Sequence, residues 1–230
     1  MDADEMLATT RAVRKRLDPG RAVPAELIRE CVDLALQAPA GSNVARTRFV
    51  VVRDPGLREQ VAAVYSDIYL NQYRDSDGYI GRVAARDADS QQRTARSADA
   101  LERALHEVGT IVIACLDGVR LDGSPAFASA SMLGGVLPAT WSFMLAARAR
   151  GLGTCWTTMH LARERDVAGI LGIPFETVQQ VCLTPVAFTK GEKFAPAARP
   201  GAEEVIHWDR WDDSKAGAPP LSGIARASAS

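Results

Sequence analysis

The sequence lacks an excess of charge of either sign. Its 27 Lys and Arg residues nearly balance its 28 Asp and Glu residues over 230 positions, which leaves a formal net charge of -1. A chain without a strong net field does not gather polyanions or dock electrostatically on an anionic membrane. We therefore expect neither nucleic acid nor a lipid surface as a partner.

Cysteine is scarce, and the familiar metal and nucleophile motifs are missing. The four cysteines lie far apart inside apolar stretches and form no C-x-x-C pair, which is typical of small buried side chains in a reducing compartment. The sequence has no Walker A lysine motif, no G-x-S-x-G elbow and no H-E-x-x-H pair. Its three histidines are scattered, as surface or core histidines are. We therefore expect no metal site.

A secretory leader and a clear membrane span are also missing. The N-terminus MDADEMLATT is acidic and lacks the basic patch and apolar run of a signal peptide, so we expect a cytoplasmic protein. Residues 123–147 carry no charge and are long enough to span a bilayer, but they are rich in Ser, Ala and Gly, and Pro138 interrupts them. We interpret this stretch as a helix buried all round by protein, with a membrane anchor as the alternative.

Periodicity and turn residues predict an α+β fold, a sheet layered by helices. Asp54 and Pro55 supply an N-cap and a first-turn proline for one of the helices. Pro185 confines the last strand to an edge or a bulge, because proline cannot donate to a central ladder. The helices are expected at 25–38, 57–69 and 161–174, in addition to 123–147, and the strands at 48–52, 110–116 and 178–188.

We expect a single domain over residues 1–212. Within it, residues from about 71 to 99 are polar and crowded with Arg, Asp and Ser, so they offer little apolar area for a core and are interpreted as an insertion or lid. Residues 213–230 are rich in Ser, Ala, Gly and Pro and are expected to form a loose or partner-wrapping tail.

Two segments carry charge suited to phosphate. The N-terminal run places Arg11, Arg14 and two further basic residues within six positions, and guanidinium groups make bidentate bonds to phosphate. Near the end of the domain, Arg199 precedes Pro200 in a stiffened loop. The alternatives are a solvated basic turn for the first segment and a surface structure pinned by tryptophans for the second.

Two further segments combine small and polar residues. The string APAGSN, residues 38–43, lets backbone approach a flat ligand, and Asn43 can both donate and accept hydrogen bonds at a ring edge. The string RGLGTCWTT, residues 150–158, leaves the uncharged helix through two glycines, but its G-x-G lacks the third glycine of a dinucleotide fingerprint. Taken alone, the first string is also consistent with a simple helix stop.

In this order, the segments resemble the FMN-dependent nitroreductase family from about Thr9 to Trp211. TRAVRK resembles the family's R-R-S-x-R-K, LALQAPAGSN its A-P-S-x-x-N, RARGLGTCWTT its A-x-G-L-G-x-x-W, and ARPGAEEVIHW its R-x-P-x-E-x-V-x-W ending. The resemblance implies a nitroreductase-like, mainly antiparallel sheet flanked by helices in an intertwined homodimer. It also explains the uncharged helix, which packs against its twin in this family.

The resemblance implies a cofactor site shared between two subunits. Two arginines would face the FMN phosphate and ring, a third would close on the phosphate, one loop from the partner subunit would touch the ribityl chain, and one strand end would lie along the isoalloxazine. The first two arginines are Arg11 and Arg14, with Ala12 where a serine is usual, and the third is Arg199. The loop residues are Pro39, Ala40, Gly41 and Asn43, and the residues of the strand end are Trp156, Thr157 and Thr158. No residue is assigned as catalytic.

The implied reaction is a ping-pong transfer in which NAD(P)H reduces the flavin and a nitroaromatic, quinone or similar small acceptor then oxidises it. Ala45, Arg46 and Thr47 depart from the family's x-Q-P-W continuation, and Thr10 stands where its first arginine usually lies. Arg46 and the arginine-rich insertion favour an acidic or polar acceptor. The alternatives are a specialised flavoenzyme of the same fold, such as a dehalogenase, a dehydrogenase or a flavin-fragmenting enzyme, and a non-catalytic flavin- or deazaflavin-binding protein.

Overall fold

The computed structural model describes residues 1–74, 88–191 and 193–215. The chain divides into two compact units, Met1–Ala195 and Pro196–Ser230, and each is described by itself. Residues 75–87 of the expected insertion and residues 216–230 of the expected tail lie outside the described part of the chain. The role of the insertion as a lid stays a prediction.

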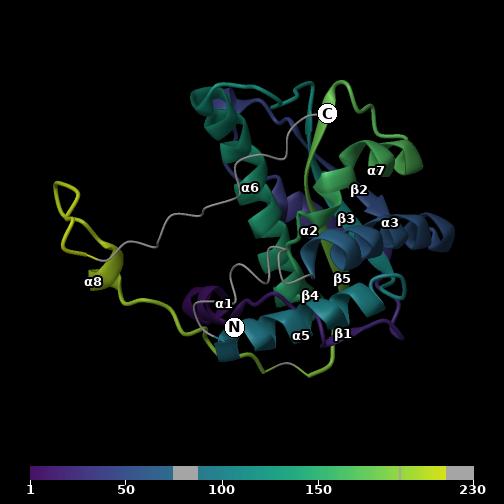
Figure 1. The fold of residues 1–230 in the computed structure, drawn as a ribbon, viewed down its shortest axis with the longest axis horizontal. Helices are drawn as coiled ribbons and strands as arrows, with labels where there is room; N and C mark the ends of the chain where they lie inside the picture. The colour runs from purple at the N-terminus through teal and green to yellow at the C-terminus, as the bar shows by residue number, and fades with distance from the viewer. Residues whose placement is uncertain (75–87, 192, 216–230) are drawn as a thin grey trace. The chain divides into compact units, whose positions relative to one another are not determined.

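Five strands form one antiparallel sheet in the first unit (Figure 1). This arrangement confirms the predicted α+β fold with a mainly antiparallel sheet, and the three strands expected from the sequence are β2, β3 and β5. Hydrogen-bonded neighbours run from β1 (Leu17–Asp18) to β5 (Val178–Thr189), β3 (Thr110–Asp117) and β2 (Thr47–Val52), and β4 (Leu152–Thr154) pairs with the other side of β5.

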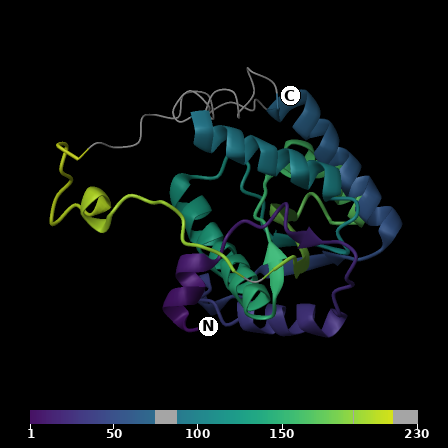
Figure 2. The same ribbon diagram turned by 90° about the horizontal axis from the view of Figure 1, so that it is seen from below.

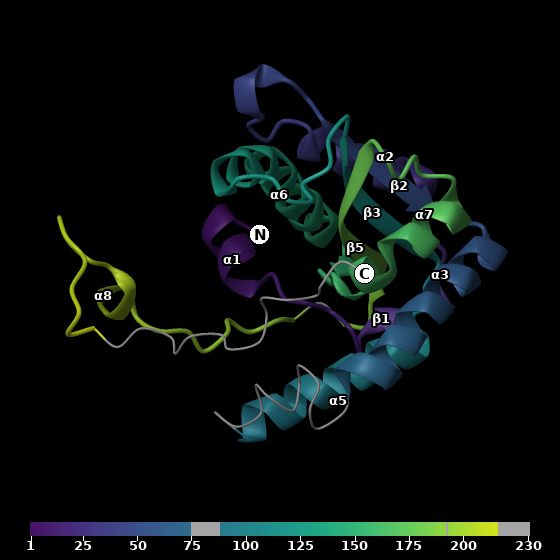
Figure 3. The same ribbon diagram turned by 45° about the horizontal axis from the view of Figure 1, so that its top comes forward.

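Helices cover both faces of the sheet (Figure 3). On one face lie α2 (Ala25–Ala35) and α6 (Ala126–Ala149); on the other lie α3 (Pro55–Ile68), α5 (Ala88–Ala104) and α7 (Glu164–Leu171). Side chains alternate along β3, so that its odd-numbered positions 111–115 enter the core under α3 and its even-numbered positions 112–116 enter the core under α6. The remaining elements are α1 (Ala3–Thr9), which lies against α6 (Figure 2), the short helical turns η1 (Gly41–Asn43), η2 (Tyr69–Tyr73) and η3 (Met159–Arg163), and α8 (Ala202–Val205) in the second unit.

Local sequence signals set the ends of the helices. The Asp54 side chain accepts a hydrogen bond of 2.9 Å from the Leu57 amide, and Pro55 occupies the first turn of α3, as the sequence predicts. Gly151, with a φ of 74°, ends α6 in the left-handed conformation that glycine adopts at little cost. The four cysteines are buried and unpaired, which confirms their interpretation as core side chains.

One side of α6 is exposed among the described residues of the first unit. This helix is long and apolar enough to cross a bilayer by length and composition, but its buried side packs against α2 and β4 in the core. The opposite side carries Phe127, which is 85% exposed, and also Leu137 and Trp141. A single chain therefore does not bury α6 all round, and the exposed apolar face calls for another protein surface.

The expectation that Pro185 lies on an edge strand or at a bulge was wrong. β5 lies between β3 and β1 on one side and β4 on the other, and the register shift of the β3–β5 pair lies at residues 114–115 of β3. Successive N–H groups along a strand point to opposite sides, so one proline costs a bond on one side only. Leu183, two residues earlier, donates its N–H to the Thr157 carbonyl (2.8 Å), on the β4 side. The pairing of Pro185 with Ile111 of β3 is therefore undisturbed.

His160 is a fully buried histidine whose two ring nitrogens lack hydrogen-bond partners among the described residues. It lies in η3, which packs against α3 and β5. Burial disfavours the charged imidazolium and lowers the pKa of His160 from 6.5 to about 3. The folded protein therefore holds this imidazole neutral at every pH above that value.

We predict that acid destabilises the fold through His160. Between pH 6.5 and about 3 the unfolded chain takes up a proton on this residue that the folded chain does not. The free energy of unfolding should therefore fall by about 1.4 kcal/mol for each pH unit below 6.5 from this group. Urea unfolding of His160→Leu across that range should lose this part of the slope, whereas His106→Gln, at an exposed position, should keep it. Equal slopes in both variants would contradict the assignment.

Candidate functional site

Two of the predicted segments, the N-terminal arginine run and residues 150–158, meet at the edge of β4 that faces away from β5. After α1 the chain runs in extended form beside β4, where Ala12 pairs in parallel with Thr154 and the Val13 amide donates to the Thr154 carbonyl (2.8 Å). This pairing places Arg11 and Arg14, both partly buried, next to the 155–158 segment. The arginine run is therefore docked on the sheet and is not a fully solvated turn.

Gly153 makes this close approach possible. A Cβ atom at this position would lie 2.7 Å from Thr189 Cγ2 and 2.8 Å from Val13 Cγ1, so no larger residue fits without displacing its neighbours. The glycine that ends the G-L-G string thus permits backbone-to-backbone docking. Its role is steric, since it is not among the glycines with positive φ.

The ladder between β4 and β5 is interrupted where Pro185 has no N–H to donate. Thr154 pairs with Val186, and pairing resumes in the same register at Thr157, which exchanges two hydrogen bonds with Leu183 (3.0 and 2.8 Å). Backbone N–H groups alternate between the two sides of a strand, so an N–H at position 185 would point toward β4, as that of Leu183 does. Proline has no N–H, and this hydrogen bond is therefore not formed. The break therefore falls at positions 155 and 185, and the antiparallel register is the same on both sides of it.

The interrupted stretch sends its side chains to both faces of the sheet. Cys155 is fully buried in the core under α3, whereas Trp156 packs against the core under α6. Thr157, paired with Leu183, faces the α3 side and is partly exposed, and Thr158 is exposed. The segment 155–158 therefore ends at solvent with two threonine hydroxyls, immediately beside Arg14.

A polar cluster joins these segments to α3. Arg14 lies near enough to the Cys155 thiol, and Thr157 near enough to the Tyr65 phenol, to oppose the rise that burial causes in the pKa of each group. Burial raises the pKa of the Cys155 thiol and raises the pKa of Tyr65 to about 12, so both groups keep their protons at neutral pH. Among these four side chains, Arg14 alone carries a charge, and the cluster is therefore suited to an anionic ligand.

Sequence reasoning missed Tyr65 and Cys155. Tyr65 occupies an inward-facing position of an amphipathic helix, and Cys155 lies in an apolar run, so both match an ordinary core pattern. Only the pairing of β4 with β5 and the packing of α3 bring them beside the predicted residues. No local motif signals such a contact.

The predicted loop 38–43 lies on α6. A Cβ atom at Gly41 would lie 3.7 Å from the Ser131 carbonyl, and one at Gly135 would lie 3.8 Å from the Ala40 Cα. Pro39 and Asn43 are exposed, and Asn43 has a φ of 55°, a conformation that asparagine tolerates well. The described contacts of this loop run to α6, and none of them joins it to the Arg14 cluster within one chain.

Arg199 belongs to the second unit, where it is exposed three residues before α8. The aromatic residues of this unit are also exposed: Trp208 and Trp211 are each 72% exposed, and the His207 ring stacks on Trp211 at 4.1 Å. The role of Arg199 stays a prediction, as do those of the other residues assigned to the cofactor.

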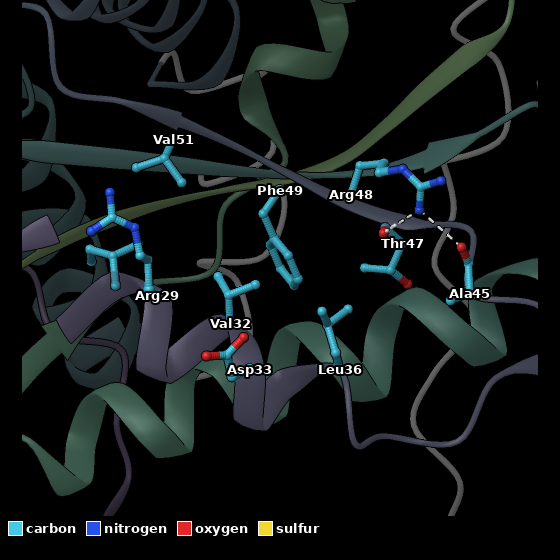
Figure 4. Close-up of a pocket in the computed structure, with 10 residues that line it drawn as sticks. Arg29, Val32, Asp33, Leu36, Ala45, Thr47, Arg48, Phe49 and Val51 are labelled. Carbon is cyan, nitrogen blue, oxygen red and sulfur yellow. Dashed lines mark hydrogen bonds between the residues drawn. The ribbon is translucent and has the colours of Figure 1, made fainter. Parts of the chain in front are cut away.

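A groove of about 510 Å³ lies elsewhere, between α2 and β2 (Figure 4). Its floor is apolar, with Val32, Leu36 and Phe49, and the predicted site residues do not line it. At its rim, Arg48 pairs with Asp117 at 2.9 Å and donates to the Ala45 and Thr47 carbonyls. Its volume alone does not make it the site, because the two guanidinium groups that line it, Arg29 and Arg48, already pair with Glu26 and Asp117.

The comparisons with known proteins agree on one fold. The model of the nitroreductase family matches residues 7–188. Protein DrgA of Synechocystis sp. is 27% identical over 155 residues, which cover 67% of this chain and 70% of DrgA. Oxidised iodotyrosine deiodinase, solved with FMN and 3-iodo-L-tyrosine bound, is similar with a TM-score of 0.70 at 19% identity, covering 90% of this chain and 99% of that one. A BluB-like flavoprotein from Clostridium difficile 630 is similar with a TM-score of 0.65 at 16% identity, covering 91% and 100%.

We predict that Gly153→Ala disturbs the docking of the N-terminal segment. The added methyl group would overlap Val13 and Thr189, which costs about 1–3 kcal/mol in overpacked sites. Thermal unfolding should show this loss. The matched control is Gly169→Ala in α7, where a Cβ meets nothing within 4 Å and helix propensity favours alanine by about 0.5–1 kcal/mol. Equal stability of the two variants would argue against a tight crossing at Gly153.

Proposed function

The chain belongs to the nitroreductase family, and from this membership we propose that it is an FMN-dependent NAD(P)H oxidoreductase that works as a homodimer. The observation that carries the proposal is the convergence of Arg14 and the 155–158 segment at the edge of β4. A similar fold has been solved with FMN bound, in iodotyrosine deiodinase. The neutral partners of Arg14 fit this cofactor, because they leave its charge available for a phosphate or an electron-rich ring.

In this proposal Arg11 and Arg14 bind the phosphate and the ring edge, and Arg199 closes on the phosphate. Ala12 contributes backbone where a serine is usual in the family. Trp156, Thr157 and Thr158 lie along the ring system. The small residues Pro39, Ala40 and Gly41, with the amide of Asn43, come from a second copy of the chain and contact the ribityl chain.

The exposed face of α6 supports the homodimer. Phe127, Gly134, Leu137 and Trp141 follow one another at helical spacing along this face, and an apolar strip of this kind is covered in stable proteins. The loop that carries Gly41 rests on the same helix, at Ser131. A second copy packed on α6 would therefore contact the loop that carries Gly41. Within a single chain this loop lies apart from the Arg14 cluster.

When bound, FMN would supply the redox chemistry, taking electrons from NAD(P)H and passing them to a small oxidised acceptor. The chain would bind and orient both reactants, and the charge of Arg14 would stabilise negative charge that develops on the ring. This role requires no dedicated acid or base, so we assign no catalytic residue. Nitroaromatics and quinones are the proposed acceptors, and exposed arginines of α5, Arg93 and Arg96, favour acidic or polar ones.

A specialised flavoenzyme of the same fold is the second candidate. The similarity to iodotyrosine deiodinase covers nearly the whole of that chain, although at 19% identity it supports only the fold. A survey that pairs NAD(P)H oxidation with product analysis separates the two candidates. A broad reductase turns over many nitroaromatics and quinones, whereas a specialised enzyme yields one defined product from one class of substrate. A non-catalytic flavin or deazaflavin protein binds its cofactor but turns over none of them.

We predict that Arg14→Gln weakens FMN binding by about 10- to 100-fold, because hydrogen bonds to charged groups contribute about 1.5–3 kcal/mol. Titration of the apoprotein with FMN, followed by fluorescence quenching, measures the dissociation constant. The matched control is Arg29→Gln in α2, whose side chain is 72% exposed and pairs with Glu26 on the same helix. Equal affinity in the two variants would exclude Arg14 from the site.

We also predict that Gly134→Glu prevents dimer formation. A side chain at this position meets nothing within 4 Å in the single chain, so the monomer tolerates it, whereas a charge inside an apolar interface is unfavourable. Analytical ultracentrifugation should show a dimer for the wild type and a monomer for this variant. Gly169→Glu, at an equally open helix glycine in α7, should remain dimeric. A dimeric Gly134→Glu protein would place the interface elsewhere.

A further inference from the structure

Arg16 joins the N-terminal arginine segment to the chain just beyond β5. The Lys190 amide donates to the Arg16 carbonyl at 2.8 Å. The Arg16 guanidinium in turn donates from Nε to the Lys190 carbonyl and from Nη1 to the Lys193 carbonyl, both at 2.8 Å. Because Arg16 follows Arg14 by two residues, the segment proposed to bind phosphate also holds the end of the first unit.

Phe194 is the next residue after Lys193, and its ring contacts two guanidinium groups. The Arg16 Cζ lies 4.0 Å from the centroid of the ring, and the Cζ of Arg148, in the last turn of α6, lies 4.3 Å from it. A guanidinium over an aromatic ring is attracted by the negative charge of the ring face. Phe194 is partly buried and also packs against the core under α3, so several elements fix its position.

The stretch that follows Phe194 is short and stiff. Arg199 lies five positions further along the chain. Five fully extended residues span at most about 18 Å, so the position of Phe194 limits where Arg199 can lie. Pro196 and Pro200 restrict this stretch further, because each fixes its own φ and disfavours the helical region for the residue before it. A short, stiff connection raises the effective concentration of the group that it carries.

We propose that Phe194 is a positioning residue that tethers Arg199 to the arginines of the N-terminal segment, where the FMN phosphate binds. Held by Arg16 and Arg148, Phe194 fixes the point from which the stretch carrying Arg199 begins. The proposal rests on the proposed function, since it assigns a role within the same site. Phe194 acts through Arg199 and does not itself bind the phosphate.

Phe175 provides a matched control elsewhere in the first unit. It is also partly buried, packs against the core under α3 and lies under two guanidinium groups. The Arg120 Cζ is 4.1 Å and the Arg165 Cζ is 4.0 Å from the centroid of its ring. Phe175→Leu therefore removes the same contacts as Phe194→Leu, at a similar cost in packing, but from a residue that precedes β5.

The test compares FMN with riboflavin, which lacks the phosphate, in the full-length protein. We expect Phe194→Leu to raise the dissociation constant for FMN by about 3- to 10-fold and that for riboflavin by less than about two-fold, because Arg199 contacts only the phosphate. Phe194→Tyr keeps the aromatic face, and the pocket of about 640 Å³ beside Phe194 leaves room for a hydroxyl, so this variant should restore FMN affinity. Phe175→Leu should change neither constant.

A double-mutant cycle with Arg199→Gln measures whether Phe194 acts through Arg199. In the Arg199→Gln background, Phe194→Leu should change the affinity for FMN by less than about two-fold, because the group that Phe194 positions is already lost. A purely structural role of Phe194 would give the same loss in both backgrounds.

Three results would overturn the proposal: an equal loss of affinity for FMN and riboflavin in Phe194→Leu, a loss that persists in the Arg199→Gln background, or a loss no larger than that of Phe175→Leu. If Phe194→Leu does not fold, Arg16→Lys takes its place, because it keeps the charge but loses the planar guanidinium that bonds both carbonyls. The same three results then decide. A wild-type protein that binds no FMN would instead refute the proposed function, so the two failures are distinguishable.

Discussion

One missing hydrogen-bond donor, at Pro185 in the central strand, shapes the candidate site. A typical net hydrogen bond is worth about 0.5–1.5 kcal/mol, so the loss of one is tolerable in a strand that is otherwise paired on both sides. Because the register continues beyond the gap, Thr157 returns to β5 through two hydrogen bonds. The gap therefore leaves positions 155 and 156 short of a full ladder and still fixes the segment at both ends.

A second constraint on the site is the absence of a side chain at Gly153, just before residues 155–158. The N-terminal strand can approach β4 closely only there, and this approach brings Arg14 to the Cys155 sulfur. Cysteine and tyrosine are uncharged partners under these conditions, because burial raises the pKa of both groups. Among the residues that the structure describes, no carboxylate pairs with the Arg14 guanidinium, so its charge remains available for an anionic ligand.

Local signals in the sequence predicted α2, α3, α6 and α7 and the strands β2, β3 and β5, but not α5, which begins inside the expected insertion. Long-range pairing accounts for the errors at Pro185 and Tyr65. Asp54 and Pro55 define the start of α3 because a cap acts over three residues. β5 was expected at an edge or a bulge because Pro185 lacks an N–H donor. That rule does not say toward which neighbouring strand the missing N–H would point. That direction depends on the register with β4, which no local pattern encodes. Tyr65 was missed for the same reason, since its apolar surroundings and its polar contact come from distant segments.

The exposed face of α6 connects the packing of the chain to its proposed chemistry. Phe127 and Trp141 lie on a helix whose other side is already buried, so in the proposed homodimer a second copy would cover them without disturbing the core. A two-fold interface places the same surface on both copies, and each α6 would then meet the loop at Gly41 carried by its partner. Because that loop makes no described contact with Arg14 in its own chain, a site that uses both requires two copies. In the proposed homodimer, dimer formation and cofactor binding are therefore coupled: loss of the interface should weaken binding even where every residue of the Arg14 cluster is intact.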